Sequence, residues 1–423
     1  MTGDTIRQKF LSFFEDRGHK ILPGSSLVPE DPTLLLTTAG MVQFKPIFEG
    51  VEKPTYPRVA TCQRCVRTTD IDQVGKTARH LTFFEMLGNF SFGDYYKEEI
   101  IPWSWEFLTG DLALDPDRLW VSVYESDDES RTIWKRKVGI PESRIVGLGE
   151  KDNFWAAGPT GPCGPCTEII YDLGEEVGCG KHDCAVDCGC DRFLELWNLV
   201  FMQYNQAEDG ARTELKQKGV DTGLGLERAA SVLQGARTNF ETDLLRPLIE
   251  SAAGVAGVVY GQDNSSDTSL KIIADHARAI TFLTSDGVLP SNESRGYVLR
   301  RLLRRAVRHG RLLSIEKVFM PEMCEQVIAV MSNAYADVKR NRDAIIRAVE
   351  SEEERFAATL KSGLGMLEDI IDEINSSNGA QVGGDVVFRL YDTYGFPPEL
   401  TAEISAENGL EVDLDGFSAA MAV

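Results

Sequence analysis

The sequence contains no apolar stretch close to the roughly 20 residues that a helix needs to cross a bilayer. Its first ten residues, MTGDTIRQKF, lack the basic-then-apolar pattern of a secretory signal. Basic side chains are few beside acidic ones, 44 against 66, and the net charge is −22. We therefore expect a cytoplasmic protein with no membrane partner. Any contact with nucleic acid should depend on a local basic patch, because the overall charge is repulsive.

Complete nucleotide-binding loops are missing as well. VDTGLGLER (220–228) begins a GxGxxG pattern, but Arg228 stands where a third glycine would let a helix pack against its strand. GKT (75–77) would need a glycine at position 70 to form a Walker loop, and Asp70 at that position would repel phosphates. A dinucleotide fold and a Walker ATPase are therefore excluded.

The distribution of apolar residues predicts two domains. With 423 residues, 43% of them hydrophobic, the chain is long enough for two or three. Its first 240 residues contain strand-like stretches joined by polar connections, which predict a mainly antiparallel sheet flanked by helices. The expected strands are 58–67, 82–93, 119–126, 166–173 and 192–205. Helical periodicity dominates afterwards. We predict an α+β fold with a first domain at 1–240 and a mainly helical domain at 241–423.

Nine cysteines fall unevenly along the chain, and without an export signal we do not expect disulfides. CGPC (163–166) has prolines beside its cysteines and a β-rich TEIIYD after it, which favours a tight structural turn over a redox centre. GCGKHDCAVDCGCD (178–191) contains four thiols that can bind a structural zinc ion, namely Cys179, Cys184, Cys188 and Cys190. Reduced free thiols are the alternative interpretation of this cluster.

Two arginines and one aromatic ring suggest how the chain holds a nucleotide. Arg67 ends one expected strand and His80 opens the next, in which Phe84 and Met86 share a face. The glycines of VDTGLGLER leave a strand open to a flat ligand, and the helix that follows would direct Arg228 back over it. An arginine can stack on adenine and offset phosphate charge, so Arg67 and Arg228 would clamp a bent ATP. Core strands with ordinary surface arginines are the alternative.

Longer segments resemble a known family. SSLVPEDPTLLLTTAGMVQF, then QRCVR with RHLTFFEMLGNFSFGDYY, then VDTGLGLER resemble the three ordered motifs of class II aminoacyl-tRNA synthetases. TFFEMLGNFSFGDY, GPCGPCTEI, LWNLVFMQYN, PSNESRGYVLRRLLRRAVRHG and FRLYDTYGFP are similar to the alanyl-tRNA synthetases in particular. The resemblance runs from about residue 5 to the end. One departure is the loop TTDIDQVG after Arg67, where many relatives have a longer loop with a lysine near its start.

The resemblance implies that the chain couples alanine to ATP, releases pyrophosphate and transfers the alanine to the 3′ end of tRNA-Ala. It implies that Arg67 contacts the α-phosphate, that Arg228 lies over the adenine, and that His80 faces the terminal phosphates. Phe84 would stack on adenine, with Phe83 as the alternative if the register differs by one residue. The full ATP-binding set is Arg67, His80, Phe84, Met86, Gly225 and Arg228, with Mg²⁺ bridging the phosphates.

The alanine side of the site follows from the same resemblance. Asp221 would bind the substrate's ammonium group, with a helix N-cap as its alternative role, and Asn198 would hold the carboxylate. Core packing is the alternative role of the residues expected around the methyl group. The full alanine-binding set is Met41, Trp155, Asn198, Val200, Asp221 and Gly223. No side chain is needed as a nucleophile, because the alanine carboxylate itself attacks the α-phosphorus.

An arginine-rich segment, RGYVLRRLLRRAVRHGR (295–311), provides the expected basic patch. Leu299, Leu302, Leu303 and Ala306 repeat at helical spacing and should face the core. Arg300, Arg304, Arg308 and Arg311 then form a row along the opposite side that can follow a phosphate backbone, unless they serve only in salt bridges. The resemblance places this helix in the domain that reads the tRNA acceptor stem, with Asn292 and Asp392 at its guanine–uracil wobble pair.

Two other functions remain open from the sequence. An alanine-activating ligase with a non-tRNA acceptor would lack the Asn292, Asp392 and arginine-helix combination, and a non-catalytic RNA- or zinc-binding module would not need Arg67, Asp221 and Arg228 together. The family also carries an editing domain with a His/Cys metal motif, and no HxxxH occurs here. We expect the aminoacylation part alone, in monomeric form, which would mischarge serine or glycine without correcting it.

Overall fold

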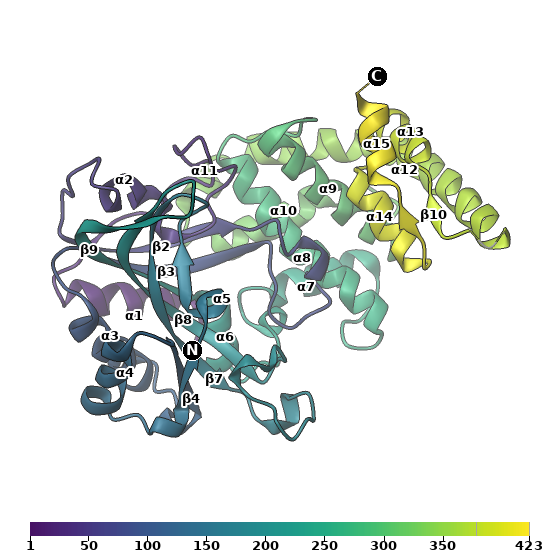
Figure 1. The fold of residues 1–423 in the computed structure, drawn as a ribbon. Helices are drawn as coiled ribbons and strands as arrows, with labels where there is room; N and C mark the ends of the chain where they lie inside the picture. The colour runs from purple at the N-terminus through teal and green to yellow at the C-terminus, as the bar shows by residue number, and fades with distance from the viewer. Residues whose placement is uncertain (378, 423) are drawn as a thin grey trace. The chain divides into compact units, whose positions relative to one another are not determined.

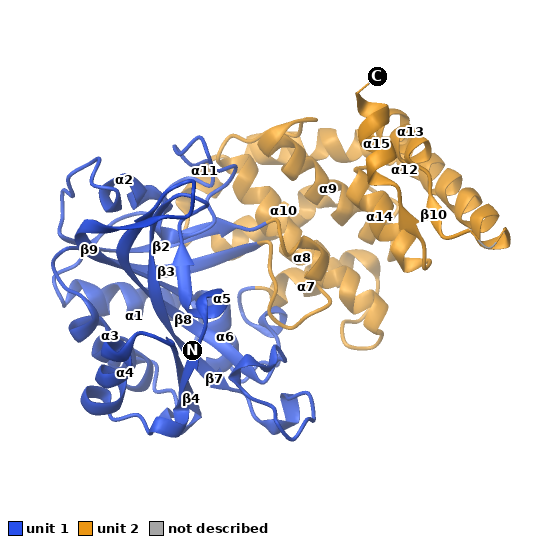
Figure 2. Cartoon of the chain, viewed as in Figure 1, with its two compact units in different colours: residues 1–67, 83–244 blue, residues 68–82, 245–423 orange. Residues whose placement is uncertain are grey.

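A computed structural model of the chain describes residues 1–377 and 379–422. These residues form two compact units, coloured separately in Figure 2. Unit 1 consists of residues 1–67 and 83–244, and unit 2 of residues 68–82 and 245–423. None of the helices in the described residues is both long and apolar enough to span a membrane.

Unit 1 is built on a nine-stranded sheet (Figure 1). The strands are β1 (Lys20–Ile21), β2 (Arg58–Val66), β3 (Phe83–Phe92), β4 (Leu119–Tyr124), β5 (Ile145–Leu148), β6 (Phe154–Ala156), β7 (Gly161–Asp172), β8 (Phe193–Gln206) and β9 (Arg212–Gly225). Their order is β1-β2-β3-β9-β8-β7-β4-β5, and β6 pairs with β7. All pairings are antiparallel except β1 with β2 and β4 with β5 at the two edges. The prediction of a mainly antiparallel sheet is confirmed.

Six helices of unit 1 flank this sheet. They are α1 (Gly3–Glu15), α2 (Lys45–Phe48), α3 (Lys97–Glu106), α4 (Asp128–Ile133), α5 (Glu150–Asn153) and α6 (Leu226–Leu233). Phe10 of α1 packs against Trp197 of β8 and Phe107, with ring centroids 5.6 Å and 5.5 Å apart. This aromatic core lies behind β8, since Trp197 is fully buried. The opposite face of the same strands carries the predicted substrate residues.

The CGPC motif differs from the prediction of a tight turn. It lies within β7, where Cys163 pairs with Tyr204 and Cys166 pairs with Val200 across a register shift. Gly164 is needed there because a Cβ would come within 1.9 Å of the Phe201 carbonyl oxygen. Burial raises the pKa of the Cys166 thiol, so the motif has the chemistry of buried thiols.

Unit 2 is mainly helical, as predicted. Its helices are α7 (Arg246–Ala256), α8 (Asn264–Ser285), α9 (Ser294–Leu312), α10 (Met320–Met331), α11 (Ala336–Arg340), α12 (Arg342–Ser376), α13 (Gly384–Tyr394), α14 (Pro398–Glu407) and α15 (Leu414–Met421). A short parallel pair, β10 (Gln381–Val382) and β11 (Glu411–Val412), lies near its end. The apolar side of α9 is buried as its periodicity predicts, with Leu299, Leu302, Leu303 and Ala306 at 0% exposure.

The segment 68–82, which joins β2 to β3, folds with unit 2. Its Ile71 and Val74 are buried. Gly75 has a φ of +83° and packs so closely on α8 that a Cβ would lie 2.9 Å from the Thr268 carbonyl oxygen. His80 lies in this segment and does not open a strand, because β3 begins at Phe83. The assignment of 1–240 and 241–423 as functional domains remains a prediction.

Candidate functional site

Strand β9 presents two very different faces. Val220, Thr222 and Leu224 are fully buried on one of them. Alternation places Gly219, Asp221, Gly223 and Gly225 on the other. A Cβ at Gly223 would lie 2.9 Å from the sulfur of Met86. Glycine is therefore required at this position, because the Met86 side chain packs directly on the backbone of β9. The VDTGLGL stretch is therefore a flat floor with a single carboxylate.

That carboxylate belongs to Asp221, which pairs with Phe90 on β3 and Val200 on β8. It is 5% exposed, and burial raises its pKa from 3.8 to about 7. Among residues 1–377 and 379–422, no cation pairs with it. Asp221 lies inside a strand, so its alternative role as a helix N-cap was wrong. A buried carboxylate without a cation is suited to bind a ligand's ammonium group.

Apolar side chains surround this carboxylate. Met41, from the 3₁₀ turn η1 (Gly40–Phe44), and Val200 are buried in one cluster with Phe90. Trp155 of β6 and Met86 of β3 pack against the same cluster and stay partly exposed. The structure thus brings together the three side chains predicted around a methyl group, next to Gly223 and Asp221.

Asn198 occupies the position on β8 opposite Gly223. Its Nδ2 donates to Oε1 of Glu168 at 3.4 Å, while its own Oδ1 is buried and accepts no hydrogen bond among the described residues. Buried polar atoms are normally paired. The Oδ1 of Asn198 therefore remains unpaired among the described residues, while its amide nitrogen lies beside Glu168 and Cys166.

Arg67 and Phe84 meet at the start of β3. The central guanidinium carbon of Arg67 lies 5.0 Å from the centroid of the Phe84 ring, and its Nε donates to the Thr38 carbonyl oxygen at 3.1 Å. Phe83 is fully buried, whereas Phe84 is partly exposed. Of the two candidate stacking rings, Phe84 is therefore the one with a face left for a ligand.

Arg228 lies in the first turn of α6, and its side chain folds back over Gly225. A Cβ at Gly225 would be 3.4 Å from the Arg228 Cδ. The guanidinium donates to the side chain of Glu195 at 2.8 Å and to its carbonyl oxygen at 3.0 Å. The predicted orientation of Arg228 over the strand agrees with this geometry.

Two carboxylates at this site were missed from the sequence. Alternation would place Glu195 with Trp197 in the core, but a register shift between β7 and β8 after Ile169 turns it toward Arg228. Glu168 lies on β7, and burial followed by the charge of Glu195 raises its pKa. Acidic residues inside otherwise apolar strands were the available signal. Both groups offer oxygen ligands suited to Mg²⁺.

His80 belongs to unit 2, whereas the other ATP-site candidates belong to unit 1. Its Nδ1 lies 2.8 Å from Oγ1 of Thr77. The role of His80 at the terminal phosphates remains a prediction.

A cavity of about 270 Å³ in unit 2 brings together four of the predicted tRNA contacts. Asn292, Arg300, Arg304 and Asp392 all line it. Glu352 is 3% exposed, and one of its oxygens lies 3.0 Å from Nε of Arg300 and 2.6 Å from Nη2 of Arg304. Arg300 also donates to Oδ1 of Asn292. The cavity is therefore polar, and the buried carboxylate of Glu352 fixes the positions of two arginines that line it, Arg300 and Arg304.

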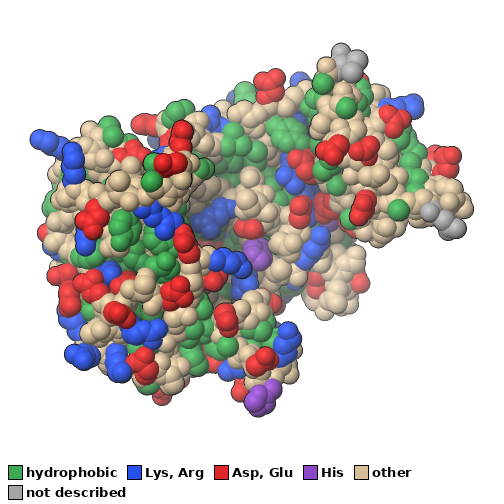
Figure 3. Space-filling view, viewed as in Figure 1, with side chains coloured by type: hydrophobic (Ala, Val, Ile, Leu, Met, Phe, Trp, Pro, Cys, Tyr) green, Lys and Arg blue, Asp and Glu red, His purple; other side chains and the backbone are tan. Residues whose placement is uncertain are grey.

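The four arginines of α9 do not form one open row. Arg308 is 3% exposed and pairs with Glu407 of α14, and Arg311 donates to the Ile315 carbonyl oxygen at 2.9 Å. Neither of them lines the cavity. Salt bridges inside unit 2, the alternative role considered for this helix, account for Arg308. On the face drawn in Figure 3, basic and acidic side chains are interspersed.

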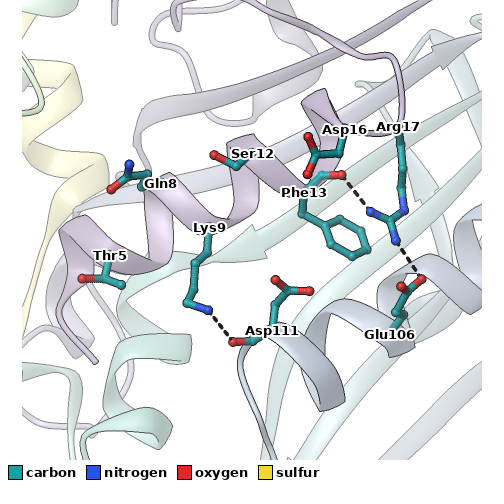
Figure 4. A pocket seen from close by; sticks show the side chains of 9 residues that line it. All are labelled: Thr5, Gln8, Lys9, Ser12, Phe13, Asp16, Arg17, Glu106 and Asp111. Atoms are coloured by element: carbon teal, nitrogen blue, oxygen red, sulfur yellow. Dashed lines mark hydrogen bonds and ion pairs between the residues drawn. The ribbon is translucent and has the colours of Figure 1, made fainter.

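A second cavity, of about 480 Å³, lies on the outer side of α1 in unit 1 (Figure 4). Its basic groups are already engaged, because Lys9 donates to the Asp111 carbonyl oxygen and Arg17 pairs with Glu106. It is lined by Thr5, Gln8, Lys9, Ser12, Phe13, Asp16, Arg17, Glu106 and Asp111. None of the predicted site residues is among them.

The four cysteines of the segment 178–191 lie close together in space. The sulfurs of Cys179, Cys184, Cys188 and Cys190 all lie within 4.8 Å of one another. Cys179 and Cys188 are 3.4 Å apart, and Cys184 and Cys190 are 3.5 Å apart. Four thiolates around a tetrahedral zinc ion lie about 3.8 Å from each other, given zinc–sulfur distances of about 2.3 Å. The donor set and its spacing fit zinc.

The glycine floor of β9, its carboxylates and the arginines on either side together form a candidate substrate site on a mainly antiparallel sheet. Residues 5–423 match the family described as tRNA synthetases class II (A), and the chain belongs to this family. It is 57% identical over 422 residues to an alanine–tRNA ligase of Pelotomaculum thermopropionicum, covering 100% of this chain and 48% of that protein. It is 55% identical to an alanine–tRNA ligase of Desulforamulus reducens, with the same coverages.

The chain thus spans about half the length of the curated relatives it matches. Among solved structures, an apo S. aureus histidyl-tRNA synthetase aligns with a TM-score of 0.35 and 11% identity, covering 55% of this chain and 66% of that chain.

Proposed function

We propose that this chain activates alanine with ATP to form alanyl-adenylate and transfers the alanine to the 3′ end of tRNA-Ala. The observation that carries the proposal is Asp221, a buried carboxylate with a raised pKa and no cation beside it, on a glycine floor next to a small apolar cluster. An ammonium group and a short apolar side chain match these two neighbours. The relatives named as alanine–tRNA ligases support the same substrate.

In this proposal Asp221 binds the alanine ammonium group, and Asn198 donates from its amide nitrogen to the carboxylate. Met41, Trp155 and Val200 enclose the methyl group, and Gly223 lets the substrate lie against the strand. The alanine carboxylate oxygen attacks the α-phosphorus of ATP, and pyrophosphate leaves. Positioning and charge supply the catalysis, so the absence of a nucleophilic side chain is consistent with the reaction.

The nucleotide lies between two arginines. Phe84 stacks on adenine beside Arg67, whose Nη atoms hold the α-phosphate, and Arg228 covers the opposite side above Gly225. Met86 borders the same floor, and His80 serves the terminal phosphates. Mg²⁺ offsets the charge that develops on the phosphates when it is bound, and Glu168 and Glu195 are the carboxylates suited to hold it.

The cavity of unit 2 would read the acceptor stem of the tRNA. Asp392 accepts from an exocyclic amino group in the minor groove, Asn292 lies beside it, and Arg300 and Arg304 provide positive charge. Arg308 and Arg311 would act only at the periphery of this surface. The cysteine cluster would hold a structural zinc ion, with reduced thiols as the alternative.

Alanine-dependent exchange of pyrophosphate into ATP tests the activation step. We expect exchange with alanine, and a chain without it would favour a binding module. Charging of tRNA-Ala tests the transfer step separately. Exchange without charging would favour a ligase for another acceptor.

A further inference from the structure

The segment 68–82 is tied to helix α8 by one buried hydrogen bond. The backbone N–H of Thr82 donates to Oδ1 of Asp275 at 2.9 Å. Both residues are fully buried. Thr82 directly precedes Phe83, the first residue of β3, so this bond fixes the point at which the segment with His80 becomes the strand with Phe84.

Asp275 is itself held by a chain of buried polar groups. Its Oδ2 lies 2.9 Å from Nδ1 of His276, and Nε2 of His276 lies 3.0 Å from Nη1 of Arg305. Arginine can only donate, so Nε2 accepts, and the proton on Nδ1 is donated to Asp275. The histidine ring is thereby fixed in one neutral tautomer, in agreement with a pKa lowered by burial.

The chain continues across α9 into α14. Nε and Nη2 of Arg305 donate to the two oxygens of Glu403, each at 2.8 Å. One turn earlier on each helix, Arg301 lies 3.7 Å from Glu399 and 3.6 Å from Asp72 in the segment 68–82. Arg301 and Arg305 therefore connect α14 with both ends of the segment.

Burial of apolar side chains alone would dock the segment, because Ile71 and Val74 already have no more than 1% exposure. Apolar contacts are not directional, whereas a hydrogen bond to a fixed carboxylate sets the position of one backbone atom. The polar chain therefore supplies orientation at Thr82, beyond the docking itself.

We propose that Asp275, aligned by His276 and Arg305, is a positioning residue. It fixes the position of the segment 68–82, which carries His80 and leads into Phe84, so that ATP can bind. The proposal rests on the proposed function for the roles of His80 and Phe84. Asp275 touches no substrate and acts through the backbone at Thr82. It should govern the affinity for ATP and leave the affinity for alanine unchanged, because Asp221 and Asn198 lie on β9 and β8.

The test compares Asp275→Ala, Asp275→Asn and Glu353→Gln in the full 423-residue chain. Titration calorimetry gives the Kd for Mg-ATP, and pyrophosphate exchange gives KM for ATP and for alanine. Glu353 is the matched control, since it is buried and accepts two backbone N–H groups at 3.0 Å and 2.9 Å elsewhere in unit 2.

We expect Asp275→Ala to raise Kd and KM for ATP about tenfold, with KM for alanine unchanged. Asp275→Asn should fall between wild type and Ala. The asparagine oxygen can still accept from the Thr82 N–H, but its NH2 group then faces Nδ1 of His276. If Nδ1 carries the proton, two donors face each other there, and if Nε2 carries it, two donors face each other at Arg305. Glu353→Gln should leave both constants unchanged. If Asp275→Ala does not fold, Asp275→Asn decides by the same measurements.

An unchanged Kd for ATP in a folded Asp275 variant overturns the proposal, as does an equal rise in both KM values. A wild-type chain that binds ATP without alanine-dependent exchange refutes the proposed function. The Kd comparison still decides the role of Asp275 in that case. A wild-type chain that binds no ATP overturns both.

Discussion

The guanidinium of Arg67 lies over the ring of Phe84, with 5.0 Å between its central carbon and the ring centroid. The same arrangement recurs at the other end of the sheet, where Arg118 lies 5.1 Å from the Tyr171 centroid and its Nε donates to a backbone carbonyl. Arg118 thus makes the same two kinds of contact as Arg67, to an aromatic ring and to a backbone carbonyl oxygen, but lies outside the proposed site.

This pair gives a matched test of the nucleotide clamp. Arg67→Lys keeps the charge but removes the planar fork, so kcat/KM for ATP in pyrophosphate exchange should fall about 100-fold. Arg118→Lys also removes a planar guanidinium group and should leave kcat/KM for ATP near the wild-type value. Comparable losses in the two variants would assign Arg67 a structural role.

The raised pKa of Asp221 predicts a pH dependence of alanine binding. Burial holds this carboxyl neutral up to a pKa of about 7, and only the ionised form attracts an ammonium group. The affinity for alanine should rise with pH until about 7 and then level off, with about a tenfold loss for each pH unit below. Calorimetry between about pH 5.5 and 8.5 measures it. Affinity that is constant over this range contradicts the assignment.

The same group predicts how stability changes with pH. Between its ordinary value of 3.8 and about 7, the folded protein binds a proton that the unfolded chain has released. The contribution of Asp221 to the free energy of unfolding therefore falls as pH rises through that window. Asp221→Asn should lose this contribution and should not bind alanine. Urea titrations of both proteins at several pH values give the comparison.

Recognition of the acceptor stem is expected to depend on Asp392. Asp392→Ala should reduce the preference for a stem with the wobble pair over a Watson–Crick stem by about 10- to 100-fold, while pyrophosphate exchange persists. Asp385 lies on the same helix, α13, outside the cavity, so Asp385→Ala is the control. Parallel loss of exchange and charging in the Asp392 variant would mean that Asp392 is structural.

Metal analysis decides the state of the cysteine cluster. We expect about one zinc ion per chain, lost in Cys188→Ser and kept in Cys324→Ser, whose cysteine is buried elsewhere in α10. Removal of the metal should lower the thermal midpoint and leave pyrophosphate exchange intact, because the cluster lies outside the substrate floor. Purified chain without zinc would identify the four groups as reduced thiols.

Local patterns were sufficient to predict much of this molecule. Alternation predicted β2, β3 and β8, and the arginine that interrupts GxGxxG predicted a helix folding back over a glycine strand. Two features depend on partners far away in the sequence and could not be predicted from local patterns. Glu195 turns toward Arg228 through a register shift with β7, and CGPC extends as a strand because β8 pairs with it. The sequence allowed salt bridges for the arginines of α9 but could not identify Glu407 as the partner of Arg308.

The segment 68–82 joins two strands of unit 1 but belongs to unit 2. The chain leaves unit 1 after Arg67, folds with α8 and returns at Phe83. A single cut after residue 244 therefore does not yield two self-sufficient halves. The N-terminal half would carry Ile71 and Val74 without the helices that bury them. We expect this half to aggregate and to be cleaved rapidly by proteases within the segment 68–82.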